Sequence, residues 1–376
     1  MPITYPLAIR GAVLERCDAV RPFAASRPIT IDQLMLAAPR AGELLVRMEA
    51  ACICHSDLSV VDGGRQRPTP LLLGHEAAGI VEDAGAATQG FAVGDRVVMT
   101  FLPRCGACAA CETEGRLPCE RGSMANQAGE LLDGGRRLSR NGAEVHHHLG
   151  VSGFATHAVV DARSVVRVDH DVPPEVAALL GCAVLTGGGA VLNAAAARPG
   201  STIVVVGLGG VGMAAVIVAQ ALGHRVIGVD GVAHKRELAL RVGAAEAYGP
   251  DEAKAACVRG AAVIEAAGNP RAFETAVELT AAGGTTVTVG LPAPDAEARV
   301  KPLDLVAQAQ TIVGSYLGSA IPPRDVPRFV ELWREGRLPV GELMSDVISL
   351  DEINEGMDAL ASGDALRQLI RFEGGR

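Results

Sequence analysis

The fold of this chain is decided by residues 202–230, which read TIVVVGLGGVGMAAVIVAQALGHRVIGVD. Thr202–Val206 predicts a short buried strand, and Met213–Leu222 predicts a helix that follows a glycine-rich loop. A second valine-rich run, Arg225–Val229, predicts the next strand. A strand, a helix and a second strand in this order form a βαβ unit, so the sequence predicts a parallel sheet covered by helices.

The loop between the first strand and the helix has the spacing of a dinucleotide-binding fingerprint, Gly207-Leu-Gly209-Gly210-Val211-Gly212. The first glycine would make the tight turn, the second would let the backbone approach a pyrophosphate, and the third would let the helix pack closely on the strand. The helix N-terminus adds the positive end of a dipole. Because glycine is common here, at 45 of 376 residues, the loop alone is weak evidence.

Asp230 strengthens the cofactor prediction, because it ends the next predicted strand, 23 residues after Gly207. An acid at that place accepts hydrogen bonds from a ribose 2′-OH and repels a 2′-phosphate. We therefore predict NAD as the cofactor, with Lys235 among its contacts. Lys235 and Arg236 leave residual use of NADP open. The alternative is a glycine-rich turn followed by an aspartate that caps a helix.

Composition excludes several function classes. Of the 376 residues, 49% are hydrophobic and 20% are charged, which excludes disorder as the main state and suits two domains. A net charge of −9 without a basic cluster argues against a nucleic-acid partner. The N-terminal residues MPITYPLAIRGAVLERCDAV lack the apolar run of a signal peptide. We therefore expect a cytoplasmic, reducing location, where cysteines are more often metal ligands or buried thiols than disulfides.

Two uncharged stretches, Val176–Ala197 and Ser201–Gly223, are long enough to span a membrane. Both are rich in glycine, and the second divides into a strand, a turn and a helix. A strand and a helix together cannot cross a bilayer as one helix, so we interpret both stretches as core and expect no membrane partner.

The chain changes character near Pro173. Up to about Val168, short apolar runs alternate with turn residues, which is typical of a β-rich domain. After Pro173, valine-rich strands alternate with alanine-rich helices, which is typical of a parallel sheet. The predicted strands are Glu43–Glu49, Ala78–Glu82, Arg96–Thr100, Ala262–Glu265 and Thr285–Val289, and the further helices are Lys235–Val242, Arg271–Leu279, Asp325–Glu335 and Leu350–Ser362.

A four-cysteine loop carries the first metal prediction: Cys105, Cys108, Cys111 and Cys119 follow the spacing C-x2-C-x2-C-x7-C. Four thiolates in one loop can close around a zinc ion at about 2.3 Å per bond. They leave no position for a substrate, so we predict a structural zinc ion. An iron–sulfur cluster and unligated or disulfide-paired thiols are the alternatives.

Three more candidate ligands are scattered along the chain: Cys54, His75 and Cys182. Two cysteines and one histidine leave the fourth position of a tetrahedral zinc site for water or substrate, as in catalytic zinc sites. Spacing alone is weak evidence, because Cys54 and Cys182 lie more than 100 positions apart. A lone buried cysteine or histidine is usually a packing residue.

The ordered set of motifs resembles a known family. CHSD at 54–57, LLLGHEAAGIVEDAG at 71–85, GDRVV at 94–98, the four-cysteine loop, GCAVLTG at 181–187, GLGGVG at 207–212 and VGLP at 289–292 occur as in the zinc-dependent medium-chain alcohol dehydrogenases. This resemblance spans nearly the whole chain. It implies an α/β fold with a GroES-like β-rich catalytic domain at residues 1–183 and a Rossmann domain with a doubly wound parallel sheet at 184–316. Residues 317–376 would return to the catalytic domain.

The resemblance also assigns roles around the second metal site. It makes Cys54, His75 and Cys182 the ligands of a catalytic zinc ion, so that two zinc ions are expected per chain. Glu76 looks like an acid that approaches this metal, and Asp57 like the acid that orients the ligating histidine.

A proton relay is implied as well. Ser56 matches a hydroxyl that takes the proton of an alcohol and passes it to the cofactor ribose. Many relatives end this relay with a histidine where this chain has Ser59. His55 or direct transfer to water would then replace it, so we predict a weaker rate dependence on a group that titrates near pH ~6.5.

Further cofactor contacts follow from the resemblance. His55 and Arg367 match residues that reach the pyrophosphate, while Thr186 and Val211 match residues that pack on the nicotinamide. Val289 matches a residue whose backbone meets the carboxamide. The alternative for Arg367 is an ordinary surface arginine.

The substrate pocket is the least determined part. Phe101, His148, Leu149 and Tyr316 match pocket positions, and His148 is unexpected because an aromatic or apolar residue is usual there. It would bind a polar group of the substrate or point elsewhere. Ser123 replaces an arginine of the glutathione-dependent formaldehyde branch, which argues against a glutathione adduct.

The sequence therefore predicts a zinc- and NAD-dependent oxidoreductase that interconverts primary or aromatic alcohols with aldehydes or ketones. One alternative is a reductase of activated double bonds on the same fold, although such relatives typically lack the Cys, His, Cys set. Another is a non-catalytic protein that binds zinc and NAD. Relatives assemble through the edge of the Rossmann sheet, here near residues 299–312, so we expect a homodimer, with a tetramer as the alternative.

Overall fold

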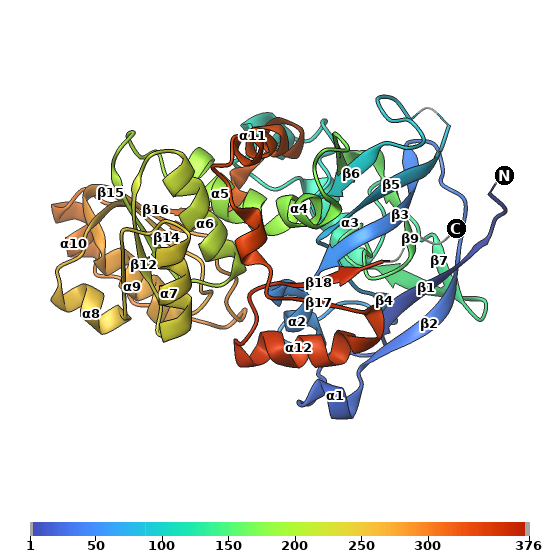
Figure 1. Cartoon of the computed structure of the whole chain (residues 1–376), viewed down its shortest axis with the longest axis horizontal. Coiled ribbons are helices and arrows are strands. Elements are labelled where there is room, and N and C mark those ends of the chain that lie inside the picture. The colour runs from blue at the N-terminus through green and yellow to red at the C-terminus, as the bar shows by residue number, and fades with distance from the viewer. Residues whose placement is uncertain (1–2, 87, 373–376) are drawn as a thin grey trace. The chain divides into compact units, whose positions relative to one another are not determined.

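The computed structural model describes residues 3–86 and 88–372. The chain forms two compact units (Figure 1). The first unit holds Met1–Thr113, Pro118–Cys182 and Met344–Arg376, and the second holds Glu114–Leu117 and Ala183–Leu343. The structure therefore ends this part of the first unit at Cys182, one residue before the predicted boundary at residue 183.

The first unit is built from β-strands, as the short apolar runs predict. Five strands close a barrel in the order β1 (Leu7–Leu14), β2 (Ile29–Leu36), β7 (Leu138–Arg140), β8 (Ala143–His147) and β4 (Leu71–Leu72). A seven-stranded sheet has the order β10 (Val165–Val168), β6 (Arg96–Met99), β5 (Ala77–Ala84), β3 (Glu43–Cys52), β18 (Gln368–Arg371) and β17 (Asp346–Ile348), while β9 (His157–Asp161) pairs with β3. The late strand β18 thus lies beside β3, about 320 positions earlier in the chain.

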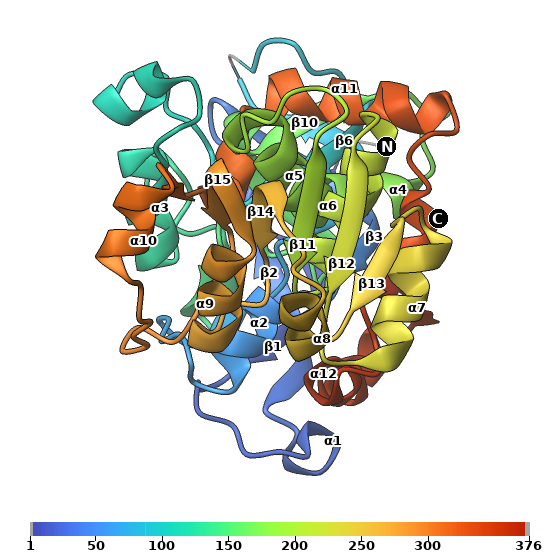
Figure 2. The same ribbon diagram turned by 90° about the vertical axis from the view of Figure 1, so that its left-hand side faces the viewer.

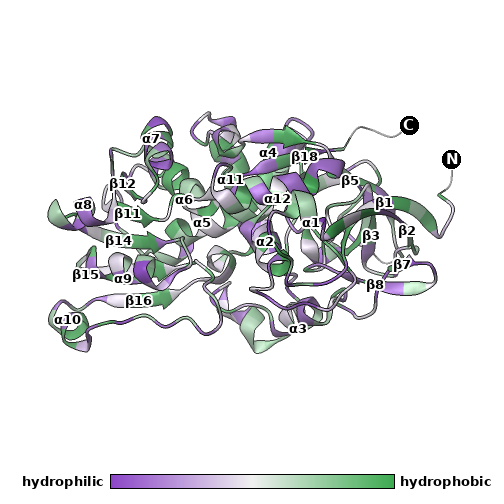
Figure 3. Cartoon of the chain, turned by 90° about the horizontal axis from the view of Figure 1, so that it is seen from below, coloured by the Kyte–Doolittle hydropathy of each residue, from purple (hydrophilic) through white to green (hydrophobic). Residues whose placement is uncertain are grey.

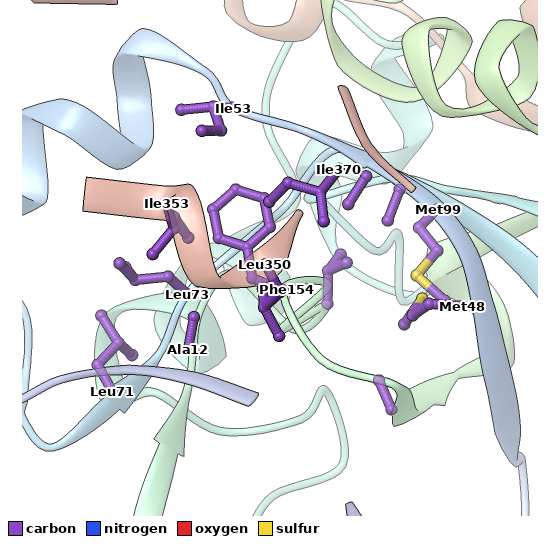
Figure 4. Packing of buried hydrophobic residues seen from close by; sticks show 14 of the residues in the cluster. Ala12, Met48, Ile53, Leu71, Leu73, Met99, Phe154, Leu350, Ile353 and Ile370 are labelled. Carbon is purple, nitrogen blue, oxygen red and sulfur yellow. The ribbon is translucent and has the colours of Figure 1, made fainter. Parts of the chain in front are cut away.

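Helices cover this unit at a few places. They are α1 (Phe23–Ser26), α2 (His55–Val61), α3 (Glu120–Ala128), α4 (Pro174–Leu179) and α12 (Ile353–Ser362), with short helical turns at η1 (Ala109–Thr113), η2 (Ala162–Ser164), η3 (Leu180–Val184) and η7 (Leu350–Glu352). The main core packs Phe154 with Ile353 of α12 and Ile370 of β18 (Figure 4). This packing ties the C-terminal segment to strands from the first half of the chain.

The second unit is a parallel sheet of six strands (Figure 2). Its order is β13 (Glu246–Tyr248), β12 (Arg225–Val229), β11 (Thr202–Val206), β14 (Gly260–Glu265), β15 (Thr280–Thr288) and β16 (Thr311–Gly314). Strands β11 and β12 begin and end where the sequence predicts. The strand order reverses between β11 and β14, so the loop after β11 lies at the carboxyl end of the sheet at its switch point, where open α/β sheets bind ligands.

The helices of the second unit follow the predicted alternation. They are α5 (Leu185–Gly189), α6 (Gly210–Ala221), α7 (Ala233–Arg241), α8 (Pro250–Ala255), α9 (Pro270–Glu278), α10 (Pro302–Ala307) and α11 (Pro322–Arg334), with turns at η4 (Ala190–Ala194), η5 (Tyr316–Ser319) and η6 (Val340–Leu343). Hydrophobic residues run along β11, β14 and α6 (Figure 3), and nearly all of them are buried. The doubly wound parallel sheet is therefore confirmed.

The predicted return to the first domain at residue 317 is wrong, because the structure places it at Met344. Phe329 of α11 packs against Gly188 of α5, where a Cβ would lie 2.9 Å from the ring. A Cβ on Gly189 would lie similarly close to the carbonyl oxygen of Gly318 in η5. Residues 317–343 are thus held by α5 within the second unit.

One described helical stretch, Pro174–Ala194, is long and apolar enough by composition to cross a membrane, and 89% of its most apolar 18-residue window is buried. It runs through α4, η3, α5 and η4, so it contains two π-helical turns. The expectation that residues 176–197 form core agrees with this burial. The other flagged stretch, Ser201–Gly223, forms β11, a loop and α6 as predicted.

Candidate functional site

The four-cysteine loop brings its sulfur atoms together in the first unit. The Sγ atoms are 3.9 Å apart for Cys105 and Cys111, 3.6 Å for Cys108 and Cys111, and 3.9 Å for Cys108 and Cys119. Two sulfurs on one tetrahedral zinc ion at about 2.3 Å lie about 3.8 Å apart. The loop therefore has the size of a closed zinc site.

Backbone N–H groups point at these sulfurs. The N–H groups of Cys105 and Gly122 donate to Cys119 Sγ at 3.3 and 3.4 Å. The backbone N–H of Glu120 lowers the pKa of the Cys108 thiol to about 6. Such donors favour the thiolate form that binds metals. All nine cysteines lie within the described ranges and are free, so the disulfide alternative is not realised.

A second group of donors gathers in the first unit from three distant segments. Cys54 precedes α2, His75 lies between β4 and β5, and Cys182 lies in the π-helical turn η3. Together with Glu76, their ligand atoms all lie within 4.8 Å of one another. The Sγ atom of Cys182 is 3.6 Å from Nε2 of His75, which matches the separation of about 3.6 Å expected for a sulfur and a nitrogen on one zinc ion.

Two glycines allow this convergence. Gly74 has φ +93°, and a Cβ there would lie 2.5 Å from the backbone nitrogen of Phe154. A Cβ at Gly181 would lie 1.9 Å from the carbonyl oxygen of Met99 in β6. These close backbone approaches set the positions of the next residues, His75 and Cys182. A larger side chain at either glycine would push a ligand out of place.

Asp57 connects the first two ligands. It is fully buried in α2, where its Oδ2 accepts a hydrogen bond from the Cys54 backbone N–H at 3.1 Å. Its Oδ1 lies 2.9 Å from Nδ1 of His75. Burial alone would raise the pKa of Asp57, but the attraction of His75 and the side-chain contacts with His148 and His75 outweigh burial and hold the pKa below its usual range. A charged Asp57 fixes a proton on Nδ1 of His75 and leaves Nε2 for a metal.

Arg367 lies beside the same group and is 2% exposed. Its Nη2 donates to Cys54 Sγ at 3.4 Å, and its Nε is 3.3 Å from Oε2 of Glu76. The alternative of a surface arginine is therefore wrong. Burial raises the pKa of Glu76 to about 7, against the lowering effect of Arg367. Neither carboxylate oxygen of Glu76 has an aligned hydrogen bond among the described residues.

These orphaned oxygens test whether a metal suits the site. Buried carboxylate oxygens normally have partners, because leaving one unsatisfied costs about 1–3 kcal/mol. Two thiols, an imidazole whose Nε2 faces a sulfur, and a carboxylate without an aligned hydrogen bond converge within 4.8 Å and form the donor set of a divalent zinc site. The residues present therefore fit the metal that the sequence predicts.

The three fingerprint glycines of the loop in the second unit lie in different environments. A Cβ on Gly207, which has φ +91°, would lie 2.6 Å from the backbone nitrogen of Ala267, and one on Gly212 would lie 1.8 Å from the carbonyl oxygen of Gly207. A Cβ on Gly209, the N-cap of α6, would meet nothing within 4 Å. The first and third glycines are required by packing, whereas the second opens onto free space at a helix N-terminus, where a phosphate fits.

Asp230 follows β12 and lines a cavity of about 490 Å³ beside this loop, together with Gly207, Asn269 and Arg271. Its Oδ2 accepts a hydrogen bond from the Leu208 backbone N–H at 2.7 Å. The side chain therefore holds the loop while it faces the cavity, which fits its predicted position at the ribose. Lys235 is half-buried in α7, and the neighbouring Arg236 donates to the Asp230 carbonyl oxygen at 2.8 Å.

Three further predicted cofactor contacts lie in the same unit. Thr186 is buried in α5, Val211 lies in the first turn of α6, and the backbone nitrogen of Val289 donates to the carbonyl oxygen of Glu265 at 2.9 Å. A Cβ on Gly187 would lie 2.1 Å from the carbonyl oxygen of Val211, so α5 and α6 pack closely here. The roles of these three residues toward a cofactor stay predictions.

The predicted relay residues lie on α2. His55 is exposed and Ser56 is half-buried. The Oγ of Ser59 donates to the carbonyl oxygen of His55 at 2.8 Å, so this hydroxyl is tied to the backbone of its own helix. This contact agrees with the expectation that Ser59 does not replace a histidine as a base.

The four predicted pocket residues divide between the units. Phe101, His148 and Leu149 are buried in the first unit, and Tyr316 is half-buried in the second. The rings of Phe101 and His75 meet edge to face with centroids 5.5 Å apart. His148 is 1% exposed, and its Nδ1 lies 3.2 Å from Oδ1 of Asp57. The role of these residues in a pocket stays a prediction.

Sequence reasoning missed Glu265, which ends β14 and is buried. Its Oε1 accepts hydrogen bonds from the backbone N–H groups of Ala267 and Gly268, and its Oε2 accepts one from Thr288 Oγ1 at 2.7 Å. It thereby joins the loop after β14 to the end of β15. The signal was present, because a glutamate that ends a valine-rich strand has the same placement as Asp230.

Comparisons with known proteins agree with this geometry. A family model described as "Alcohol dehydrogenase GroES-like domain" matches residues 40–170, and one described as "Zinc-binding dehydrogenase" matches residues 210–335. A protein of Mycobacterium tuberculosis named "Putative alcohol dehydrogenase D" is 35% identical over 359 residues, which cover 93% of this chain and 97% of that protein. The chain belongs to the zinc-dependent medium-chain alcohol dehydrogenase family.

Solved structures of this dehydrogenase family match over almost the full length. An alcohol dehydrogenase zinc-binding domain protein from Burkholderia ambifaria has a TM-score of 0.90 and 31% identity, and the match covers 98% of this chain and all of that one. Benzyl alcohol dehydrogenase from Acinetobacter calcoaceticus has a TM-score of 0.89 and 30% identity, with the same coverage. The GroES-like and Rossmann-type domains are thus confirmed.

Proposed function

We propose that this protein is a zinc-dependent alcohol dehydrogenase that transfers a hydride between a primary or aromatic alcohol and NAD, with an aldehyde or ketone as the oxidised partner. The observation that carries this proposal is the convergence of Cys54, His75 and Cys182 beside a carboxylate without an aligned hydrogen bond, on a chain that belongs to a dehydrogenase family. A structural zinc site has four protein ligands, whereas three protein ligands leave the fourth position for water or substrate.

Bound zinc would supply Lewis acidity toward the alcohol oxygen, and bound NAD would supply the hydride acceptor. The chain's own residues do the rest. Cys54, His75 and Cys182 hold the metal, and Asp57 keeps the histidine in the tautomer that ligates through Nε2. Ser56, half-buried two residues after Cys54, receives the alcohol proton. Arg367 offsets the negative charge of Cys54 and Glu76 in the buried site.

NAD is favoured over NADP by the second unit. Gly209 leaves open space at the N-terminus of α6, and the Asp230 carboxylate faces the adjacent cavity. A 2′-phosphate in that cavity would meet this negative charge. Arg271, which lines the same cavity, is the residue that could soften the discrimination.

Two observations support the proposed substrate class. The pocket candidates Phe101 and Leu149 are apolar, and Phe101 meets the ring of the ligand His75. The relative from Acinetobacter calcoaceticus is a benzyl alcohol dehydrogenase. Both favour an alcohol with an apolar or aromatic group.

The test combines zinc content with NAD reduction over a panel of primary, secondary and aromatic alcohols. Two zinc ions per chain and NADH formation with at least one primary or aromatic alcohol support the proposal. Two zinc ions without any alcohol oxidation or aldehyde reduction would overturn it. Reduction of an activated double bond in the same preparation would favour the reductase alternative.

We also propose that the protein is a cytoplasmic homodimer that pairs through the sheet edge of the second unit. Strand β16 is the last strand of its sheet, and Leu303 and Val306 of the adjacent α10 are 76% and 80% exposed. Light scattering of the purified chain measures the mass directly. A charged residue at Val306 should shift a dimer toward monomer.

A further inference from the structure

His148 touches the acid that orients the zinc ligand His75. Asp57 uses Oδ2 for the Cys54 backbone N–H, and its Oδ1 faces two imidazoles, Nδ1 of His75 at 2.9 Å and Nδ1 of His148 at 3.2 Å. The rings of the two histidines lie with centroids 5.5 Å apart at 60°. One carboxylate oxygen therefore lies within reach of two imidazoles, but it is hydrogen-bonded only to that of His75 among the described residues.

The backbone around His148 fixes this ring. His148 follows β8 directly, and its N–H donates to Ser152 Oγ at 3.0 Å. Its carbonyl oxygen accepts hydrogen bonds from the N–H groups of Val151 and Ser152 at 3.1 and 3.2 Å. This tight turn holds a side chain that is 1% exposed. Solvent therefore cannot hydrogen-bond to the Nδ1 atom of His148.

The Nδ1 atom of His148 lacks an aligned hydrogen bond among the described residues, although Asp57 Oδ1 is only 3.2 Å away. A lone pair on Nδ1 would face the carboxylate and repel it, so Nδ1 must carry the proton. A buried N–H without a partner is unfavourable, and catalytic hydrogen bonds often close only when a metal or substrate is bound. At 3.2 Å, only the alignment of the His148 N–H with Asp57 Oδ1 would have to change for this bond to form.

We propose that His148 is a positioning residue for the catalytic metal: its Nδ1–H donates to Asp57 and, through Asp57, fixes the orientation of His75. This inference rests on the proposed function, because it needs zinc at Cys54, His75 and Cys182. It explains why a histidine occupies a position that was expected to face the substrate.

A positioning role predicts an effect on metal binding rather than on substrate binding. Loss of a partner that orients a ligating histidine typically costs 10–100-fold in metal affinity or activity. A residue that recognises a substrate group would instead change KM for polar substrates and leave the metal alone. The two readings therefore separate in a metal-release experiment.

The variants are His148→Phe, which keeps a ring without an N–H, and His148→Gln, which restores an amide N–H donor. His147→Phe is the matched control. His147 is also 1% exposed, and its Nε2 accepts a hydrogen bond from the Arg137 backbone N–H at 3.0 Å. Its Nδ1 lies 3.4 Å from Ser152 Oγ, so it contacts the same turn as His148, and among the described residues its hydrogen bonds do not include Asp57. His148→Leu replaces His148→Phe if the latter does not fold.

The experiment measures the rate at which a chromogenic chelator removes zinc from the full-length protein and the visible spectrum after cobalt(II) replaces that zinc. We expect about 10-fold or faster release and altered cobalt bands for His148→Phe, with recovery toward wild type in His148→Gln. His147→Phe should lower the melting temperature and leave both readouts unchanged.

Unchanged zinc release and an unchanged cobalt spectrum in His148→Phe would overturn the inference, even if the wild type oxidises alcohols. Equal disturbance of both readouts by His147→Phe would also overturn it, because the effect would then be structural. A wild type that holds only one zinc ion per chain would instead refute the proposed function itself.

Discussion

Two alanine substitutions three residues apart should affect different properties. One should weaken cofactor binding, and the other should lower stability. Gly209 and Gly212 both belong to the loop between β11 and α6, but their surroundings differ. Gly209 has φ −75°, and a Cβ there meets nothing within 4 Å. A Cβ on Gly212 lies 1.8 Å from the carbonyl oxygen of Gly207 and 2.9 Å from its carbonyl carbon.

The magnitudes follow from these distances. In Gly209→Ala, the reduced freedom of the unfolded chain stabilises by about 0.4–1 kcal/mol, and the poorer N-cap costs a similar amount, so the net change is near zero. The new methyl group occupies the space left for a pyrophosphate. Loss of one charge-assisted hydrogen bond there, about 1.5–3 kcal/mol, weakens NAD binding about 10- to 100-fold.

In Gly212→Ala, the methyl group must displace backbone, because ordinary contact begins near 3.4 Å. Overpacking of this kind costs about 1–3 kcal/mol, against a gain of about 1 kcal/mol in helix propensity. A distance of 1.8 Å to a backbone oxygen puts the cost at the upper end of this range, so we expect a net loss of about 2 kcal/mol and a lower melting temperature. The prediction therefore separates a residue kept for the ligand from a residue kept for packing.

The assay is calorimetric titration of NAD, with thermal melting of the same preparations. Gly209→Ala should melt like the wild type and bind NAD weakly, while Gly212→Ala should melt earlier. Wild-type NAD affinity in a folded Gly209→Ala protein would refute the assignment of the loop to the pyrophosphate. Unchanged melting of Gly212→Ala would refute the close packing.

Three further predictions concern the first unit. Cys108→Ser should release one zinc ion per chain and lower the melting temperature, because a structural zinc contributes folding free energy; metal analysis and calorimetry check this. Arg367→Met should lower the free energy of unfolding by about 3–5 kcal/mol, because the buried Glu76 carboxylate would then lack a cationic partner; denaturant unfolding measures this. Adding Glu76→Gln should restore part of the lost stability. Burial lowers the pKa of His147 to about 3, so the neutral ring stabilises the folded protein fully above pH ~6.5. Between pH ~6.5 and about 3, this contribution to the free energy of unfolding falls by up to about 1.4 kcal/mol per pH unit. His147→Gln should flatten this dependence of the unfolding free energy on pH.

The second unit was predictable from sequence because its signals are local. Strand β11, the loop and α6 follow one another within about 20 residues, and each has a pattern of its own. The valine runs of β11 and β12 mark their own ends, since polar or glycine residues follow at once. Boundaries set by distant packing were not predictable, and α11 shows this. Its membership of the second unit depends on Phe329 meeting Gly188, a contact that no local pattern reveals.

The ligands of the second metal site show the same limit. Cys54, His75 and Cys182 carry no shared local pattern, and only the family resemblance joined them. What brings them together is backbone contact between distant segments, such as Gly181 against Met99. The contact between His148 and Asp57 was equally hidden, because it depends on the direction of one buried ring after β8.

The rate of NADH formation with a primary or aromatic alcohol, measured for the wild type and Cys182→Ser, tests the central claim most directly. Cys182→Ser should retain the four-cysteine zinc and the fold, hold one zinc ion fewer per chain, and lose about 10³-fold in rate. Such a loss corresponds to roughly 4 kcal/mol of transition-state stabilisation. A Cys182→Ser protein that oxidises the alcohol at the wild-type rate would contradict the account.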